Sequence, residues 1–142
     1  MRFEHFEHGA DVGVRGFGAT PEKAFEGAAS ALFSLMAEDL ASVRDESVEM
    51  LTCSGPDLPE LLVAFLNELI SLSDVRRLVF GRFEVEIERR GEHDLRLAAW
   101  VFGERYDPLR HSSTVEPKGA TFTSLKVSPG PDGWIAQCVV DV

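Results

Sequence analysis

The chain has 142 residues, of which 44% are hydrophobic and 27% are charged, a composition typical of one globular domain spanning residues 1–142. Fourteen Lys and Arg residues against 24 Asp and Glu residues give a formal charge of −10. That charge disfavours direct nucleic-acid binding, which depends on cationic side chains that neutralise phosphates. The sequence has no signal-like N-terminus and no apolar run long enough to span a bilayer, so we expect a cytoplasmic protein without a membrane partner.

The N-terminal third predicts two short strands followed by a helix. The strands are expected over residues 2–8 and 12–17, and Thr20-Pro21 begins the helix with an N-cap and a first-turn proline. Apolar and small residues then recur at helical spacing, namely Phe25, Gly27, Ala28, Ala29, Ala31, Leu32, Phe33 and Met36. The small residues indicate that this helix packs closely on a sheet.

A second helix has the clearest periodicity in the sequence. A strand over residues 48–53 precedes it, and Asp57 is the expected N-cap. Its apolar stripe comprises Leu58, Leu61, Leu62, Phe65, Leu66, Leu69 and Ile70. Asn67 and Glu68 interrupt the apolar stretch and are expected on the solvent-exposed face.

From residue 78 the hydrophobic period changes to two, which predicts a β-hairpin over residues 78–101. A loop is expected over residues 106–111, a strand over 120–127, a turn over 129–133 and a buried central strand over 134–140. Together these elements predict an α+β fold, a two-layer sandwich in which two helices pack on a mostly antiparallel β-sheet.

Asp11 is the first candidate for a functional side chain. It stands between Gly9 and Gly13, where a glycine-containing turn meets the second predicted strand, and aspartate is an unusual choice there because it is depleted in strands. Flanking glycines allow another group to approach the backbone closely. Asp11 therefore either binds something or caps its own turn through an Asx hydrogen bond, and the residues alone leave both alternatives open.

The C-terminus gives the second candidate. Asp141 precedes Val142, whose terminal carboxylate would lie beside the Asp141 side chain. Like charges so close repel each other, and a bound cation would relieve the repulsion. If the last strand lies beside Asp11, three oxygen donors converge, and oxygen donors favour calcium or magnesium over zinc or copper. The alternative is a frayed, solvated terminus.

Other side chains give weaker indications of chemistry. Lys118 precedes a predicted strand and either extends into solvent or pairs with a carboxylate or phosphate. His5 and His8 are expected on opposite faces of a strand, which argues against a chelating pair. Cys53 and Cys138 match no metal or redox spacing and are expected to be free thiols. The sequence also lacks a nucleophile elbow and a phosphate-binding loop.

Taken in order, these segments resemble the archease family over essentially the whole chain. The corresponding segments are His8-Gly9-Ala10-Asp11 for the family's His-Thr-Ala-Asp motif, Leu61-Leu62 and Leu66-Asn67-Glu68-Leu69 in the second helix, Gly103-Glu104, Arg110-His111, Lys118-Gly119-Ala120-Thr121-Phe122-Thr123 and the final Asp141. Gly9 and Thr123 stand where the family has threonine and histidine, so roles that need that hydroxyl or that imidazole do not carry over directly.

The resemblance implies a non-catalytic activator of the GTP-dependent tRNA-splicing RNA ligase, which promotes ligase guanylylation and multiple turnover. The alternative that it implies is a chaperone-like modulator of a tRNA methyltransferase or of another RNA-processing enzyme. Carried over residue by residue, it implies a divalent-cation site, usually for calcium with magnesium as the alternative, at Asp11, Asp141 and Val142. The same resemblance implies a partner-facing or supporting role for His8, Glu104 and Lys118. A metal-dependent hydrolase built on the two aspartates is a third hypothesis, but the sequence offers it no evident general base.

Overall fold

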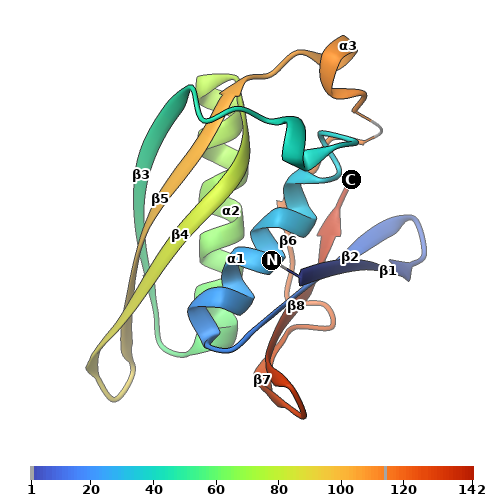
Figure 1. The fold of residues 1–142 in the computed structure, drawn as a ribbon. Helices are drawn as coiled ribbons and strands as arrows, with labels where there is room; N and C mark the ends of the chain where they lie inside the picture. Colours follow the sequence, from blue (N-terminus) through green and yellow to red (C-terminus); the bar gives the residue numbers. More distant parts are fainter. Residues whose placement is uncertain (1, 114) are drawn as a thin grey trace.

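The computed structural model describes residues 2–113 and 115–142, and in these the expected α+β class is confirmed (Figure 1). Along the chain the elements are β1 (Arg2–His8), β2 (Asp11–Gly18), α1 (Pro21–Phe33), the 3₁₀ helix η1 (Leu40–Ser42), β3 (Ser47–Gly55), α2 (Leu58–Arg76), β4 (Leu78–Gly91), β5 (Asp94–Arg105), α3 (Pro108–His111), β6 (Gly119–Ala120), β7 (Lys126–Gly130) and β8 (Gly133–Asp141).

The strands form two antiparallel sheets, with α1 and α2 between them (Figure 1). Sheet A has the order β1-β2-β8-β6, and β7 also pairs with β8; sheet B has the order β3-β5-β4. The sequence predicted a single sheet. A second sheet is present because strands cover the helices on both sides. Every residue of α1 from Ala24 to Phe33 is buried. None of the helices in the described residues has the length and hydropathy that a membrane span requires.

The close contact expected between the first helix and a sheet is made by α1 and β2. A Cβ atom at Gly16 of β2 would lie 2.1 Å from the amide nitrogen of Ala28 and 2.2 Å from the carbonyl oxygen of Ala24. One at Gly27 of α1 would lie 2.9 Å from the Gly16 Cα. Two glycines therefore face each other so that helix and strand backbones can touch. Gly16, one of the glycines that follow Asp11 in the sequence, is therefore needed for the packing of β2 against α1.

Gly9 belongs to a two-residue turn that joins β1 to β2. His8 pairs with Asp11 across this turn, and Gly9 has a φ of 61°. Hairpin turns with one positive φ at their first central position strongly prefer glycine there. Glycine at position 9 is therefore well suited to the backbone, and the turn places Asp11 as the first residue of β2.

A buried glutamate connects α1 to the edge of sheet B. Glu26 is 3% exposed, and its carboxylate accepts a hydrogen bond of 2.9 Å from the amide of Val85 in β4. Lys23 lies 3.2 Å from the other carboxylate oxygen. Since β4 pairs only with β5, this contact satisfies an amide on its free edge and holds the helix to that strand.

The C-terminal third differs from the sequence prediction in two places. The expected loop over residues 106–111 contains helix α3, which Asp107 caps by accepting a hydrogen bond from the Leu109 amide. The expected strand over residues 120–127 is interrupted: Thr121 donates to the carbonyl of Val139, and the Val139 amide donates to Thr123. Two residues thus bond to one residue of β8, and the strand divides into β6 and β7 as at a bulge. The predicted central strand over residues 134–140 is confirmed as β8.

Candidate functional site

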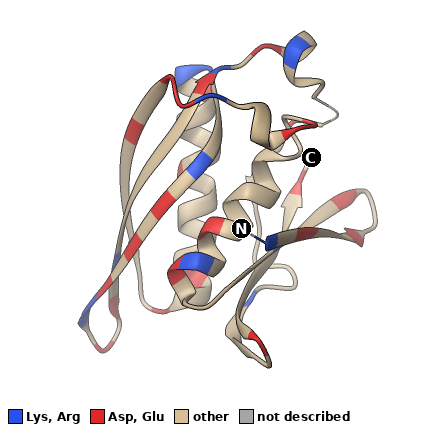
Figure 2. Cartoon of the chain, in the orientation of Figure 1, with Lys and Arg blue, Asp and Glu red and all other residues tan. Residues whose placement is uncertain are grey.

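The predicted aspartates meet at one end of sheet A. Val12 of β2 and Val140 of β8 form the last pair between these strands, and Asp11 and Asp141 each lie one residue beyond it. Asp11 and Asp141, called the carboxylate pair below, lie where the chain ends beside the β1–β2 turn, and acidic colour marks the end of β8 in Figure 2.

Neighbouring strands extend this arrangement on both sides. His8 pairs with Asp11 in β1, and Gly119 pairs with Asp141 in β6. The Asp11 carboxylate accepts a hydrogen bond of 3.4 Å from the amide of Val142, so it acts across the sheet and not as a cap of its own turn. The Lys118 amide donates a hydrogen bond of 2.8 Å to the carbonyl of Asp141. Three segments distant in sequence, residues 8–11, 118–119 and 141–142, therefore converge here.

The two carboxylates have no compensating charge in direct contact. Within residues 2–113 and 115–142, neither Asp11 nor Asp141 has an ion-pair partner. Asp11 is half-buried and Asp141 is exposed. Like charges that lie near each other disfavour the ionised state of both groups. The arrangement is therefore one in which a bound cation would stabilise the fold.

Asn67 fixes the strand that carries one side of this arrangement. Its side-chain oxygen accepts a hydrogen bond of 2.8 Å from the amide of Ala120, and its side-chain nitrogen donates one of 3.2 Å to the carbonyl of the same residue. The expectation that Asn67 lies on the solvent-exposed face of its helix was wrong, because α2 packs against β6; the adjacent Glu68 is exposed, as expected. The sequence signal was a single amide within an apolar helix.

Glu104 lies in a separate group, called the Glu104 cluster below, with the buried His111 and the exposed Arg110. Glu104 is 4% exposed; it accepts a hydrogen bond from the Arg44 amide and pairs with the Arg110 guanidinium. Burial by itself would raise the pKa of Glu104. The pKa is nevertheless held below its ordinary value by the hydrogen bond from the Arg44 amide, by the hydrogen bond and charge of Arg110, and by the nearby His111. Of the two roles expected for Glu104, its burial agrees with the supporting one.

His111 connects this cluster to α3. It is 2% exposed and stacks on Tyr106 with 5.7 Å between ring centroids. Its Nδ1 accepts a hydrogen bond of 2.9 Å from the Asp107 amide, and its Nε2 lies 3.6 Å from the Glu104 carboxylate. The cluster therefore anchors the segment that follows β5 and leads toward Lys118.

His8 and Lys118 are both exposed beside the carboxylate pair. Lys118 also lines a hollow of about 590 Å³ between α2 and the segment before β6. Asn67, Arg77 and Tyr106 contribute to the same wall. The residues that the sequence assigned to the site thus gather at one end of sheet A, except for Glu104, whose partners belong to its own cluster.

The chemistry of the carboxylate pair fits a hard cation. Oxygen donors on two aspartates are the ligands that calcium and magnesium prefer. In the described part of the chain, no three His, Cys, Asp or Glu side chains lie close enough together to hold a metal. A cation on Asp11 and Asp141 would therefore take its remaining oxygen donors from the main chain, Val142 included, or from water.

Two solved structures resemble this fold over nearly the whole chain. The solution structure of Methanobacterium thermoautotrophicum protein 1598 matches with a TM-score of 0.85 at 28% identity, covering 99% of this chain and 98% of that one. A crystal structure from Thermotoga maritima, described as an archease and possible chaperone, matches with a TM-score of 0.56 at 19% identity and covers 100% of this chain and 98% of that one. The second match shows a likeness of fold alone.

Sequence comparison gives the family. Proteins named archease are 42% identical over 142 residues in Pyrococcus abyssi and 43% identical over 146 residues in Pyrococcus furiosus. Each match covers 99% of this chain and 99% of the relative. The model of the archease protein family (MTH1598/TM1083) matches residues 3–142. The chain therefore belongs to the archease family.

Proposed function

We propose that this chain is a non-catalytic activator of a GTP-dependent tRNA-splicing RNA ligase, promoting ligase guanylylation and multiple turnover. The observation that carries the proposal is the carboxylate pair, in which Asp11 and Asp141 each lie one residue beyond the Val12–Val140 pair and neither has an ion-pair partner among the described residues. We propose further that this pair and Val142 hold a divalent cation, calcium or alternatively magnesium. When bound, the cation would neutralise the pair and offer an electrophilic centre to anionic groups of a partner.

The surrounding residues have positioning roles in this proposal. Asn67 holds the main chain of Ala120 in β6, and the Lys118 amide holds the carbonyl of Asp141. These contacts fix the end of β8 from the side opposite β2. The Lys118 side chain is exposed, which leaves its ammonium group available to a phosphate or carboxylate of the ligase.

The overall charge supports a protein partner of opposite sign. This chain carries a formal charge of −10, and a ligase that holds RNA and a nucleotide must present a basic active site. Complementary potentials steer association and accelerate it. The same charge supports the expectation that the chain does not bind RNA directly. Tight RNA binding by this protein alone at physiological salt would contradict this part of the proposal.

The function is tested by ligase guanylylation and RNA joining under multiple-turnover conditions, with this protein added in substoichiometric amounts. Asp11→Ala is compared with Asp132→Ala, which removes an exposed aspartate from the turn at the other end of β8. We expect repeated ligase turnover with the wild type and with Asp132→Ala, and a loss of activation with Asp11→Ala. Ligase turnover that is the same with and without the wild type would refute the proposal.

A chaperone-like modulator of a tRNA methyltransferase is the second candidate. It is supported by the description of the Thermotoga maritima structure as a possible chaperone. In this case the protein should reduce aggregation of a tRNA methyltransferase during heating. Equal aggregation with this protein and with serum albumin would remove the second candidate.

A further inference from the structure

The outer face of sheet B carries an apolar strip that is separate from the carboxylate pair on sheet A. In the β3–β5 register, Val48 pairs with Phe102 and Met50 pairs with Trp100, and we call these four residues the apolar strip. Val48 is 55% exposed and Met50 is 61% exposed, whereas Leu51, which points inward between the helices, is 7% exposed. The alternation shows that the strip faces away from the core.

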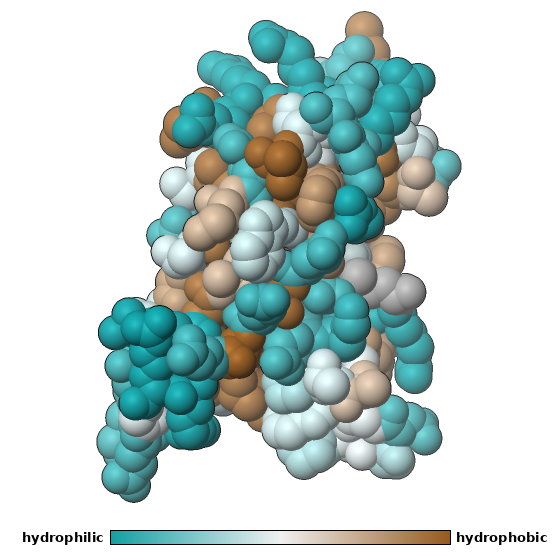
Figure 3. Space-filling view, turned by 60° about the vertical axis from the view of Figure 1, so that its left-hand side comes forward, coloured by the Kyte–Doolittle hydropathy of each residue, from teal (hydrophilic) through white to brown (hydrophobic). Residues whose placement is uncertain are grey.

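Adjacency distinguishes the apolar strip from ordinary exposed side chains. Single apolar residues on a surface are common, as with Val75 on α2 at 73% exposure, but contiguous apolar patches mark interaction sites. The four members of the strip are neighbours along and across two strands. In Figure 3, where the β3 side of the molecule comes forward, brown and pale surface lies between teal areas on this side.

Charged side chains border the apolar strip along β4, where the Arg82 guanidinium carbon lies 3.7 Å from the centroid of the Phe102 ring and three glutamates follow. Glu84, Glu86 and Glu88 alternate with inward-facing residues of this strand and are exposed. Glu84 pairs with Arg82 and Glu88 pairs with Arg90, whereas Glu86 has no ion-pair partner in residues 2–113 and 115–142. The border therefore offers at least one uncompensated carboxylate beside the apolar surface.

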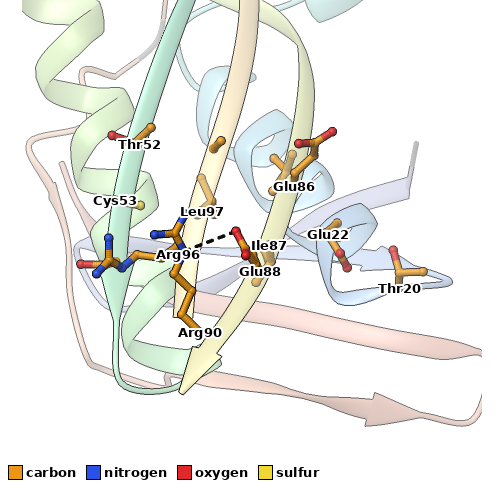
Figure 4. Close-up of a pocket in the computed structure, with 13 residues that line it drawn as sticks. Thr20, Glu22, Thr52, Cys53, Glu86, Ile87, Glu88, Arg90, Arg96 and Leu97 are labelled. Atoms are coloured by element: carbon orange, nitrogen blue, oxygen red, sulfur yellow. Dashed lines mark hydrogen bonds and ion pairs between the residues drawn. The ribbon is translucent and has the colours of Figure 1, made fainter. Parts of the chain in front are cut away.

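A hollow continues this surface toward the β4–β5 turn (Figure 4). It has a volume of about 920 Å³, and its walls include Thr52 of β3, Arg96 of β5, and Glu86 and Glu88 of β4. Long side chains with a terminal charge would fit into such an open hollow while their apolar stems lie along the sheet. Arg90 and Arg96 also line the hollow, but they pair with Glu88 and Asp94. Glu22 and Glu86 are the lining carboxylates without an ion pair among the described residues, and they favour a positive terminal charge.

These features select one class of occupant. A second copy of this chain would bring another charge of −10 to the face, and nucleic acid would be repelled for the same reason. A strand added to the edge of β3 would cover the main chain but only one side of Val48 and Met50. An amphipathic helix lying on the sheet would cover the whole apolar strip with its apolar stripe and place flanking cations against the β4 carboxylates.

We infer that the outer face of sheet B binds an amphipathic helix of a partner protein, with an apolar stripe on Met50 and Trp100 and with Lys or Arg against Glu86. This interface lies on the sheet that does not carry the carboxylate pair. The inference therefore goes beyond the proposed function and does not depend on it, because the two faces can be altered separately.

The test uses the intact protein with Trp134→Phe, which leaves Trp100 as its only tryptophan. The probe is an amphipathic Leu–Lys peptide of about 18 residues, long enough for about five helical turns. A peptide of the same composition in scrambled order and a Leu–Glu peptide are the controls. Met50→Ser tests the apolar strip, Val75→Thr is the matched control at another exposed apolar position, and Glu86→Gln tests the charge.

We expect the amphipathic Leu–Lys peptide to shift the Trp100 emission to the blue and to bind more tightly than either control peptide. Met50→Ser should weaken binding about tenfold, because it removes one well-buried apolar side chain from the contact. Glu86→Gln should weaken binding and reduce its salt dependence, and Val75→Thr should bind like the wild type. Equal binding of the ordered and scrambled peptides, or equal binding by Met50→Ser and Val75→Thr, would overturn the inference. Sedimentation would also detect self-association of the wild type. Self-association that Met50→Ser abolishes would overturn the inference, because the apolar strip would then bind a second copy of this chain.

Discussion

Replacing Asn67 by alanine should destabilise the fold and loosen the candidate site together. The Asn67 side chain makes two hydrogen bonds to the main chain of Ala120, of 2.8 and 3.2 Å. A hydrogen bond of this kind contributes about 1 kcal/mol net, and its loss leaves the amide and the carbonyl of Ala120 unsatisfied. Asn67→Ala should therefore lower the free energy of unfolding by about 2 kcal/mol.

The corresponding change in melting temperature follows from the size of the chain. With 142 residues, the entropy of unfolding near the midpoint is about 0.3 kcal/mol/K. A loss of about 2 kcal/mol is then a decrease in Tm of about 7 °C, measurable by calorimetry or circular dichroism. Glu68→Ala is the matched control, because Glu68 is the next residue of α2 and is exposed; its Tm should stay near that of the wild type.

Asn67→Asp separates the two hydrogen bonds. It keeps an acceptor for the Ala120 amide and removes the donor to the Ala120 carbonyl, so its Tm should lie between those of the wild type and Asn67→Ala. Hydrogen exchange gives a local readout: the Ala120 amide should exchange faster in Asn67→Ala and remain protected in Glu68→Ala. Equal melting temperatures and equal Ala120 exchange in Asn67→Ala and Glu68→Ala would refute the idea that this amide secures β6.

Three further predictions test other parts of the structure. Glu26→Ala should cost about 2 kcal/mol in urea unfolding, since it leaves the buried Val85 amide without its charged acceptor; an unchanged midpoint would contradict this. The lowered pKa of Glu104 contributes stability that is present above its ordinary pKa of 4.5 and lost as the pH falls, so Glu104→Gln should show a shallower acid dependence of Tm than the wild type. Burial raises the pKa of Cys138 to about 12, so this thiol should resist Ellman's reagent at mildly alkaline pH until the protein unfolds; rapid reaction in the folded state would disprove it.

Local pattern was sufficient to predict most helices and strands. The Thr20 and Asp57 caps, the apolar stripes of α1 and α2 and the alternation of β4 and β5 all depend on neighbours within a few residues. Asp11 and Asp141 were also open to prediction, because each is a carboxylate at the end of a strand. Their meeting at the ends of β2 and β8 depends on a long-range pairing that residue pattern does not determine.

What the sequence did not predict involves partners far apart in the chain. The side chain of Asn67 bonds to a residue 53 positions away, and that of Glu26 bonds to one 59 positions away. Only the fold brings such groups together, so each appeared as an isolated polar residue in an apolar helix. The second sheet has a local signal in α1, because small and apolar residues occupy all of 24–33 except Glu26 and Ser30, and this indicates cover on both sides.

The central claim is that Asp11 and Asp141 together hold a divalent cation, and calcium-dependent melting tests it most directly. At a calcium concentration about 100 times the Kd, the wild type should gain about 2.7 kcal/mol, or about 9 °C in Tm. Asp11→Asn and Asp141→Asn should melt at the same temperature with calcium and with a chelator, whereas Asp132→Asn should behave like the wild type. A wild type indifferent to both calcium and magnesium, or an equal shift in Asp11→Asn, would contradict the claim.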